Sequence, residues 1–435
     1  MTKVLRRMIL VLAAGLCIFT SCAAPGIMSE EIEDRTVITI ATWLDREDSA
    51  PERITRLFNE SQDDIRVELV TYDPGDTMTA EASIERAYMS FAAGNTPDLY
   101  HTLSFDAAKL RNGGLIEDWY PVMLSDASFN MDEYQTHIWE LLETDGKLYQ
   151  LAASFDVFGI GGPAEIYEGL SGFTIDEFRT FLNEHTDKLY IEQERMLQIM
   201  LWYGSHLDFI DREAMTCDFE SEDFLEVLTF LNELPVVPQY GTEVNVAREQ
   251  SASLHHNNHK RNGYYSRVVG VPSRYGAGPG VAIGESFALS STTEHQDACW
   301  TFIKWLLSPE TQAELYMEGS EIPIRLDVWE ESLQRSMLGG EDEKSLFYGH
   351  TTGDGEFIDG EFFPEYVDGL PAEEVEYLRQ IVANTNRTAM GFFDYESITA
   401  IVEEEVLAYL AGDKTAEECA HLIQERVSIL LAEMR

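Results

Sequence analysis

The sequence predicts an α/β fold, and three observations support that fold class. Strand-like segments alternate with amphipathic segments of helical period from residue 36 onward. Hydrophobic residues make up 44% of the chain, with 22 Phe, 19 Tyr and 7 Trp, which indicates a folded globular protein. The length of 435 residues provides for about two or three conventional hydrophobic cores. Alternation of this kind is typical of parallel sheets with crossover helices.

The N-terminal part carries the alternation most clearly. Val37, Ile38 and Ile40 form a strand-like run before Trp43, and the helix that follows has one apolar face. In chain order we expect strand, helix, strand, helix and strand at Val37–Ile40, Pro51–Ser61, Ile65–Tyr72, Thr79–Ala93 and Pro97–Leu103.

The middle of the chain continues with both element types. We expect two short strands at Lys147–Ala153 and Val157–Ile160, separated by Ser154-Phe155-Asp156. The polar Gln250–Gly263 segment is interpreted as an exposed loop. Helices are predicted at Ile175–His185, Glu192–Tyr203 and Glu222–Leu234, and strands at Val268–Val271 and Ser286–Leu289.

The last part is predicted to be helical. The segment Asp297–Leu307 is apolar nearly all round and should be buried. Ser308 caps the next helix, whose first residue is a proline. Thr415 and Glu418 form a capping box for the final helix. Residues 339–369 show no clear period.

The N-terminus has the pattern of an export signal. Lys3, Arg6 and Arg7 precede an apolar segment, Met8–Thr20, that is too short for a transmembrane helix. Its end at Cys22 resembles the lipobox of bacterial lipoproteins, with Phe19 in place of the usual aliphatic residue. We therefore expect a signal peptide at 1–21, a lipidated Cys22, a tether at 22–35 and an extracytoplasmic protein anchored to the bacterial cell membrane. The alternative is a chance cysteine inside an ordinary signal peptide.

Charge and cysteines restrict the function further. With 30 Lys and Arg against 78 Asp and Glu, the net charge is −48, which excludes nucleic-acid binding as a main function. Cys217, Cys299 and Cys419 remain after the N-terminal segment, and none has CxxC spacing. Cys299 and Cys419 are interpreted as small buried hydrophobes; one disulfide is possible without a defined pair.

No cofactor or metal is predicted. His255, His256 and His259 are interpreted as solvated rather than metal-binding, and the acidic loops near Asp354 and Asp359 lack the order of a calcium loop. No HExxH, G-x-S-x-G or S-x-x-K motif occurs, so we expect no enzyme.

Short motifs follow one another in a specific order along the chain. They are Ala92–Tyr100, Leu110–Asp118, Asp145–Leu151, Phe173–Phe178, Gly270–Pro272 with Gly276–Gly278, Ala298–Leu306, Ser308–Gln312 and Ile322–Arg325. In this order they resemble extracellular solute-binding protein family 1, the sugar-binding lipoproteins of bacterial ABC importers that include maltose-binding protein. The segment Asp187–Arg261 departs most from that pattern.

The resemblance implies a two-lobed periplasmic-binding-protein fold, type II-like, with a ligand cleft between the lobes and a helical C-terminal part. It implies an N-terminal lobe at 36–154 and 284–333 and a C-terminal lobe at 155–283 and 334–435. It also implies a monomer that delivers a mono- or oligosaccharide to ABC permease subunits. The alternatives are an exported glycan-active hydrolase, a surface scaffold, or a binder of a non-sugar solute.

Sugar sites need aromatic faces for stacking and polar groups that bracket hydroxyls. Trp43, His101 and Ser104 follow predicted strand ends, where open α/β sheets bind ligands. The further candidates are Phe155 and Asp156 at the presumed hinge, and Trp202, Tyr203, Tyr264 and Tyr265 in the second lobe. A hinge role for Phe155 and Asp156, and packing for the four aromatic residues of the second lobe, are the alternatives.

Overall fold

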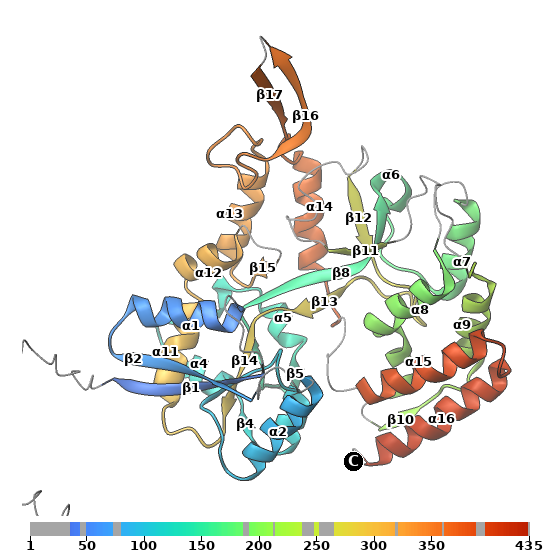
Figure 1. Cartoon of the computed structure of the whole chain (residues 1–435), viewed down its shortest axis with the longest axis horizontal. Coiled ribbons are helices and arrows are strands. Elements are labelled where there is room, and N and C mark those ends of the chain that lie inside the picture. Colours follow the sequence, from blue (N-terminus) through green and yellow to red (C-terminus); the bar gives the residue numbers. More distant parts are fainter. Residues whose placement is uncertain are drawn as a thin grey trace, which may run out of the picture. The chain divides into compact units, whose positions relative to one another are not determined.

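The computed structural model describes residues 35–43, 49–72, 80–185, 191–211, 214–236, 248–251, 265–317, 321–358, 361–388 and 396–433. Residues Thr36–Arg435 form one compact unit, shown in Figure 1. The predicted signal peptide, Cys22 and the tether up to residue 34 lie outside the described residues. Among the helices of the described ranges, none is long and apolar enough to span a membrane.

The first sheet has the strand order β2-β1-β3-β14-β4, with β7 paired to β14. β1 is parallel to β2 and β3, which confirms the predicted parallel architecture, whereas β14 is antiparallel to its neighbours. The strands are β1 Thr36–Thr42, β2 Ile65–Thr71, β3 Leu99–His101, β4 Ile116–Glu117, β7 Leu151–Ala152 and β14 Ser286–Ser290. β3 is shorter than predicted because the amides of Ser104 and Phe105 turn back to the His101 carbonyl.

Helices cover both faces of this sheet. Ile38 and Ile40 of β1 join a first core with α1 (Ala50–Ser61) and α11 (Gln296–Leu306). Ala41 points to the opposite face, because side chains alternate along a strand, and joins a third core with α2 (Ala80–Ala92). Figure 1 shows α1 and α2 on opposite sides of β1. These three helices agree with the predicted ranges to within one residue at each end.

The second sheet is built around one long strand, β8. Its N-terminal half pairs with β13 and β15, and its C-terminal half pairs with β11 and β12. Phe155 and Val157 belong to the first core, whereas Ile160 belongs to a second core, so β8 runs from one core to the other. The predicted break at residues 154–156 is wrong, because Phe155 and Asp156 pair with β13 in a continuous strand. The strands are β8 Ser154–Pro163, β11 Arg248–Ser251, β12 Ser266–Val269, β13 Gly280–Ile283 and β15 Ile322–Pro323.

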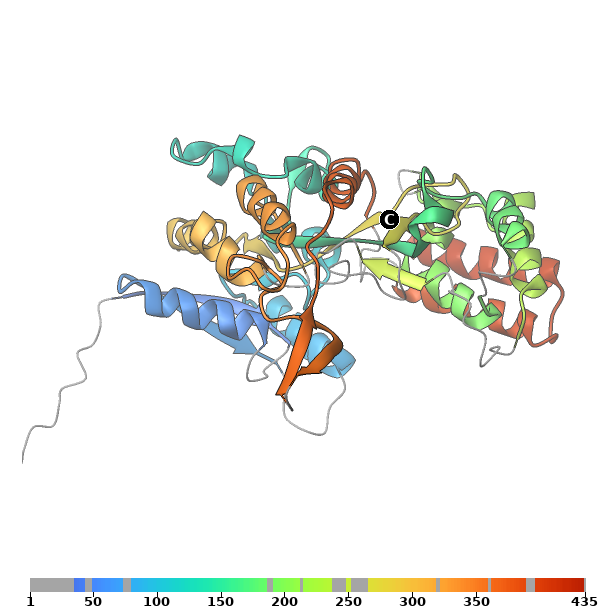
Figure 2. The same cartoon turned by 90° about the horizontal axis from the view of Figure 1, so that it is seen from above.

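The second core is mainly helical. Figures 1 and 2 show green helices of the middle of the chain beside the red C-terminal helices, and their side chains share this core. The helices are α7 Ile175–Glu184, α8 Gln193–Trp202, α9 Glu222–Glu233, α15 Glu396–Leu410 and α16 Ala416–Glu433. The Thr415–Glu418 capping box is confirmed at the start of α16 by two reciprocal hydrogen bonds.

Three further helices follow α11 in the chain: α12 Pro309–Tyr316, α13 Leu326–Ser336 and α14 Ala372–Ala383. Residues of α13 and α14 belong to the first core. Ser308 caps α12, as predicted. The antiparallel hairpin of β16 (Thr351–Ile358) and β17 (Glu361–Tyr366) was not predicted, because this stretch lacks a regular alternation of apolar residues. We expected 334–435 in the C-terminal lobe, yet Leu370, Val375 and Leu378 pack in the first core. The lobe boundaries otherwise stay a proposal.

Short elements complete the description. They are α3 Ala107–Asn112, α4 Tyr120–Ser125, α5 Thr136–Glu140, α6 Ala164–Tyr167, the 3-10 helices Met131–Glu133 and Ser205–Phe209, and the strands β5 Glu143–Thr144, β6 Lys147–Leu148, β9 Ile210–Asp211 and β10 Thr216–Cys217.

Candidate ligand-binding site

Two of the predicted residues lie together at the carboxyl end of the first sheet. His101 is the last residue of β3, and its Nδ1 is 2.8 Å from the Ser104 hydroxyl. Ser104 in turn lies 3.0 Å from the hydroxyl of Thr42, the last residue of β1. All three side chains are at most 5% exposed. The parallel strands β1 and β3 thus bring a buried polar cluster to one sheet edge, where open α/β sheets bind ligands.

The cluster continues through Glu285, which precedes β14. Its Oε2 lies 3.0 Å from Nε2 of His101, and the carboxylate is 5% exposed. The backbone holds Glu285 in place, because its carbonyl accepts from Ala153 at 2.7 Å and its amide donates to the Ser154 hydroxyl at 2.9 Å. Glu285 therefore joins the ends of the first sheet to the start of β8.

Ser154 connects this carboxylate to a second one. Its hydroxyl donates to Oε2 of Glu321, which lies just before β15. Gly284 allows the close approach, because a Cβ at this position would collide with the Ser154 hydroxyl and the Glu321 carboxylate. The result is a continuous polar network across five chain segments, formed by Thr42, Ser104, His101, Glu285, Ser154 and Glu321 and hereafter called the acidic network.

A pocket of about 230 Å³ opens beside the acidic network. Its lining residues come from the start of α1, the end of α12 and the two glutamates: Ala50, Arg53, Ile54, Glu285, Leu315, Tyr316 and Glu321. Tyr316 is 6% exposed, and its hydroxyl has no hydrogen-bond partner among the described residues. Such a group is costly unless something pairs with it.

The electrostatics of the pocket are dominated by buried negative charge. Burial raises the pKa of Glu321, and the nearby Glu285 carboxylate raises it further. Burial also raises the pKa of Tyr316 well above its ordinary value, with the two glutamates adding to the effect. Both shifts mean that additional negative charge is disfavoured in this pocket.

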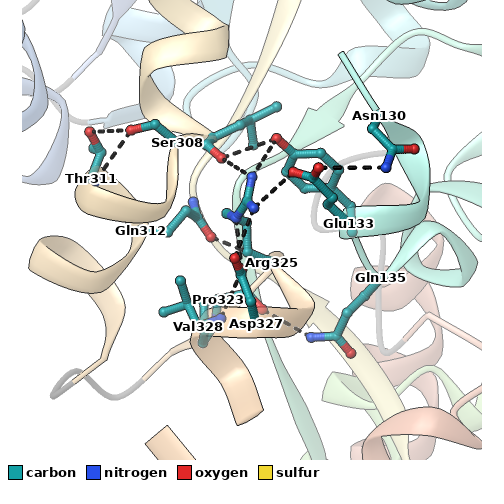
Figure 3. Close-up of polar contacts among 12 residues, drawn as sticks. Asn130, Glu133, Gln135, Ser308, Thr311, Gln312, Pro323, Arg325, Asp327 and Val328 are labelled. Atoms are coloured by element: carbon teal, nitrogen blue, oxygen red, sulfur yellow. Dashed lines mark hydrogen bonds and ion pairs between the residues drawn. The ribbon is translucent and has the colours of Figure 1, made fainter. Parts of the chain in front are cut away.

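The position of Glu321 depends on a turn anchored by Arg325, shown in Figure 3. Arg325 is 5% exposed; it donates to both Asp327 oxygens at 2.8 and 2.9 Å and to Glu133 at 2.8 Å. Hydrogen bonding to Asp327 raises the pKa of Arg325 and lowers that of Asp327. Gln135 donates to the carbonyl of Pro323 at 2.9 Å. These contacts hold β15, and with it the preceding Glu321, against the first lobe.

The other predicted residues of the first lobe and hinge are placed as follows. Trp43 directly follows β1; it is partly buried and packs against the third core. Phe155 is fully buried in the first core. Asp156 is 6% exposed, and its Oδ1 accepts the amide of Val157 at 2.7 Å. Neither hinge side chain lines the pocket, and both lie within β8.

The second-lobe candidates do not lie in the acidic network. Trp202 is 47% exposed at the end of α8, with the guanidinium of Arg195 5.6 Å from its ring centroid. Tyr203 is buried, with its ring centroid 6.1 Å from that of Phe158. Tyr265 is partly buried and packs against the first core. Tyr264 lies outside the described residues.

Sequence reasoning missed Glu285, Glu321, Tyr316 and Ser154. The two glutamates are inconspicuous among 78 acidic residues. One local signal was available, because Glu285 and Glu321 each directly precede a short strand, Ser286–Ser290 or Ile322–Pro323, whose residues are buried. No local pattern reports that the two carboxylates meet.

Metal and cysteine predictions have separate outcomes. Among the described residues, no group of three His, Cys, Asp or Glu side chains is arranged to hold a metal ion, and His255, His256 and His259 lie outside them.

Cys299 and Cys419 are buried, as predicted, and Cys217 is partly buried. These three cysteines are free thiols.

The fold of this chain is shared with proteins of known structure. The chain has the two-lobe periplasmic-binding fold of sugar-binding ABC solute-binding proteins, as solved structures with this fold match over more than nine tenths of its length. A scan against protein-family models finds no match, and neither does a sequence search of curated proteins.

Three solved structures illustrate the likeness. The sugar-binding protein MalE from Xanthomonas citri is 14% identical with a TM-score of 0.61, and 92% of this chain and 98% of that one are covered. The cyclic alpha-maltosyl-1,6-maltose binding protein from Arthrobacter globiformis is 14% identical with a TM-score of 0.57 and coverage of 91% and 99%. An ABC substrate-binding protein from Listeria monocytogenes in complex with cycloalternan is 12% identical with a TM-score of 0.59 and coverage of 92% and 100%.

Proposed function

We propose that this chain is a solute-binding protein that delivers a carbohydrate to an ABC importer and has no catalytic activity. The observation that carries the proposal is the acidic network, which lies at the carboxyl ends of β1 and β3 and opens into a pocket of about 230 Å³. Carboxylates, hydroxyls and an imidazole are the groups that bracket sugar hydroxyls. The fold is shared with the sugar-binding protein from Xanthomonas citri and the maltosyl-maltose binding protein from Arthrobacter globiformis, which supports the same function.

The proposed mechanism uses both lobes. The ligand binds first to the lobe that holds the acidic network, and aromatic side chains of the second lobe, such as Trp202, then cover it. Such closure is favoured because the ligand supplies contacts to both lobes that the open state lacks. β8 and its partner β13 form the hinge about which the second lobe moves when it closes over the ligand.

The proposal includes the location of the protein. We propose that residues 1–21 are removed, that Cys22 carries the lipid, and that residues 22–35 tether the binding protein near its permease subunits. Two or three acyl chains would hold a monomer at the membrane surface, whereas one chain gives only marginal binding. A solved structure with this fold, from Alicyclobacillus acidocaldarius, is described as an extracellular solute-binding protein, which supports the extracytoplasmic location.

A thermal-shift screen tests the function. Sugars, polyols, amino acids and polyamines are added to the purified chain, and the melting temperature is measured together with product formation. A saccharide that raises the melting temperature without turnover supports the proposal, because ligands that bind only the folded state stabilise it. Product formation would support the hydrolase alternative. A response to amino acids or polyamines alone would contradict the carbohydrate assignment.

Trp43→Ala tests the proposed stacking residue. The indole lies next to the carboxyl end of β1 and is only partly buried, so its removal should abolish ligand-induced stabilisation while the free protein stays folded. Isothermal titration calorimetry with the saccharide found in the screen measures the affinity. Unchanged affinity would remove Trp43 from the site.

A further inference from the structure

The pocket beside the acidic network contains an unusual imbalance of charge. Glu285 is 5% exposed and Glu321 is partly buried, and both line the same pocket. The Glu321 carboxylate accepts from the Ser154 hydroxyl and from the backbone amide of Glu285, and the Glu285 carboxylate contacts the His101 ring. Neither carboxylate has a Lys or Arg partner within 4.0 Å in the described part of the chain. Buried carboxylates normally need such a partner, because burial without one is costly.

His101 connects Glu285 to the first sheet through hydrogen bonds. With the Nε2–H tautomer of His101, one chain of donors runs through the network: the Thr42 hydroxyl donates to Ser104, Ser104 donates to Nδ1 of His101, and Nε2–H donates to Glu285. His101 therefore occupies Oε2 of Glu285.

Three acceptor atoms of residues that line the pocket have no side-chain hydrogen-bond partner among the described residues. The side-chain contacts above use Oε2 of each carboxylate, which leaves Oε1 of Glu285 and Oε1 of Glu321. The third is the Tyr316 hydroxyl, on a side chain that is 6% exposed. An ammonium group has three N–H donors and no acceptor, so it complements such a set.

Arg53 is the one basic side chain that lines this pocket in the described residues. Its Nη2 is directed to the carbonyl of Glu314 at 3.4 Å rather than to either carboxylate. Arg53 therefore pairs with neither of the two carboxylates in the described residues. The raised pKa of Glu321 agrees, since a bound cation would be expected to lower it.

We propose that this pocket recognises the protonated amino group of an amino sugar. The inference rests on the proposed function, because it adds an ammonium group to a saccharide ligand at the same site. In the complex, the ammonium donates to Glu285, Glu321 and Tyr316. The net charge of −48 favours the approach of cationic solutes at low ionic strength.

The test is a titration with matched saccharides that differ only at one substituent. The probes are glucosamine, galactosamine and the β-1,4-linked glucosamine disaccharide, each with its N-acetylated and its hydroxyl counterpart, together with glucuronic acid and spermidine. The free amine should bind at least about tenfold tighter than its two counterparts, because charge-assisted hydrogen bonds are about twice as strong as neutral ones. Calorimetry at pH 7 measures the affinities.

Two variants locate the effect in the pocket. Glu321→Gln should weaken amine binding by about tenfold or more, because it removes one charge-assisted acceptor. Glu314→Gln, on the exposed side of α12, makes the same change in net charge outside the pocket and should leave the affinity unchanged. Tyr316→Phe removes only the unpaired hydroxyl and should also weaken amine binding. Tyr100→Phe removes a buried, unpaired hydroxyl outside the pocket and serves as its control.

Each outcome decides between the two proposals. Equal or tighter binding of the neutral sugars would overturn the amino-sugar inference and leave the proposed function standing. Tightest binding of glucuronic acid would also overturn the amino-sugar inference and leave the proposed function standing. It would indicate that Arg53 binds the carboxylate of the ligand. Binding of spermidine without any amino sugar would overturn both the inference and the carbohydrate assignment. If no probe binds, while the screen above finds another saccharide, only the inference fails; if that screen finds no saccharide either, the proposed function fails.

Discussion

At the residue scale, Tyr316 and His206 are buried side chains that each have a polar atom without a hydrogen-bond partner in the described residues. Tyr316 presents an unpaired hydroxyl to a pocket, and His206 is 5% exposed within the second lobe. Of the site residues, His101 and Ser104 were predictable because they lie at and just after the end of β3, a strand that the sequence predicts. Glu285 and Glu321 were not, because their meeting depends on distant segments.

Tyr316→Phe should stabilise the ligand-free protein. The unpaired hydroxyl costs desolvation free energy in the folded state, so its removal should raise the free energy of unfolding by about 1 kcal/mol. Urea denaturation monitored by tryptophan fluorescence measures the change. A marked loss of stability would mean that the hydroxyl is paired in solution.

His206 should make stability depend on pH. Burial lowers its pKa from 6.5 to about 3, so between these values the unfolded chain binds a proton that the folded chain does not. The stabilising contribution of His206 to the free energy of unfolding is therefore fully present above pH 6.5. It is lost as the pH falls toward 3, by at most about 1.4 kcal/mol per pH unit.

The measurement compares urea denaturation of the parent chain and of His206→Gln between pH 7 and pH 4. The variant should lose less stability on acidification, since Gln does not titrate. His421→Gln is the control, because hydrogen bonding to Glu220 raises the pKa of the exposed His421. The stabilising contribution of His421 is present below pH 6.5 and is lost as the pH rises, which is the opposite sign. Equal pH profiles of the parent chain and His206→Gln would contradict the assignment.

At the element scale, β8 is the feature on which the two lobes depend. It pairs with β13 and β15 at one end and with β11 and β12 at the other, so one continuous strand serves both cores. The sequence predicts two strands with a break, because Ser154 and Asp156 interrupt the apolar pattern. The polar residues are tolerated because Ser154 and Asp156 find hydrogen-bond partners.

Gly159→Ala should weaken the pairing of β8 with β12. A Cβ at this position would collide with the carbonyl of Val269, which is backbone and has little freedom to move. We expect a loss of about 1–3 kcal/mol in the free energy of unfolding. Gly278→Ala is the control, because the nearest atom to its Cβ would be a carbonyl oxygen at 3.6 Å, an ordinary contact. Equal free energies of unfolding of the two variants would show that the backbone of β8 moves to accept the added methyl group without a loss of stability.

At the scale of the whole molecule, the fold combines a mixed sheet, a long shared strand and a helical second core. The parallel β2–β1–β3 arrangement and most helices follow from periodicity, and they were predicted. The antiparallel addition of β14 was not, because strand order depends on contacts between segments far apart in sequence. The net charge of −48 excludes nucleic acid as a main partner and agrees with a cationic solute.

Cys22→Ser tests the location proposed for the molecule. Without a thiol at this position no lipid is attached, so the variant should appear in the soluble fraction after cell fractionation. Ligand affinity should be unchanged, because the described unit begins at Thr36, well after residue 22. Continued membrane retention of the variant would contradict the lipobox interpretation.

Local patterns in the chain predicted the fold class, most of the helices and the burial of Cys299 and Cys419, because apolar periodicity is set by neighbouring residues. They did not predict the continuity of β8 or the hairpin of β16 and β17. The pocket was decided by tertiary structure alone. His101 and Glu285 are 184 residues apart, and Ser154 and Glu321 are 167 apart, yet each pair is hydrogen-bonded. Strand pairing creates these contacts, and with 78 acidic residues in the chain, only the folded backbone selects which two carboxylates share a pocket.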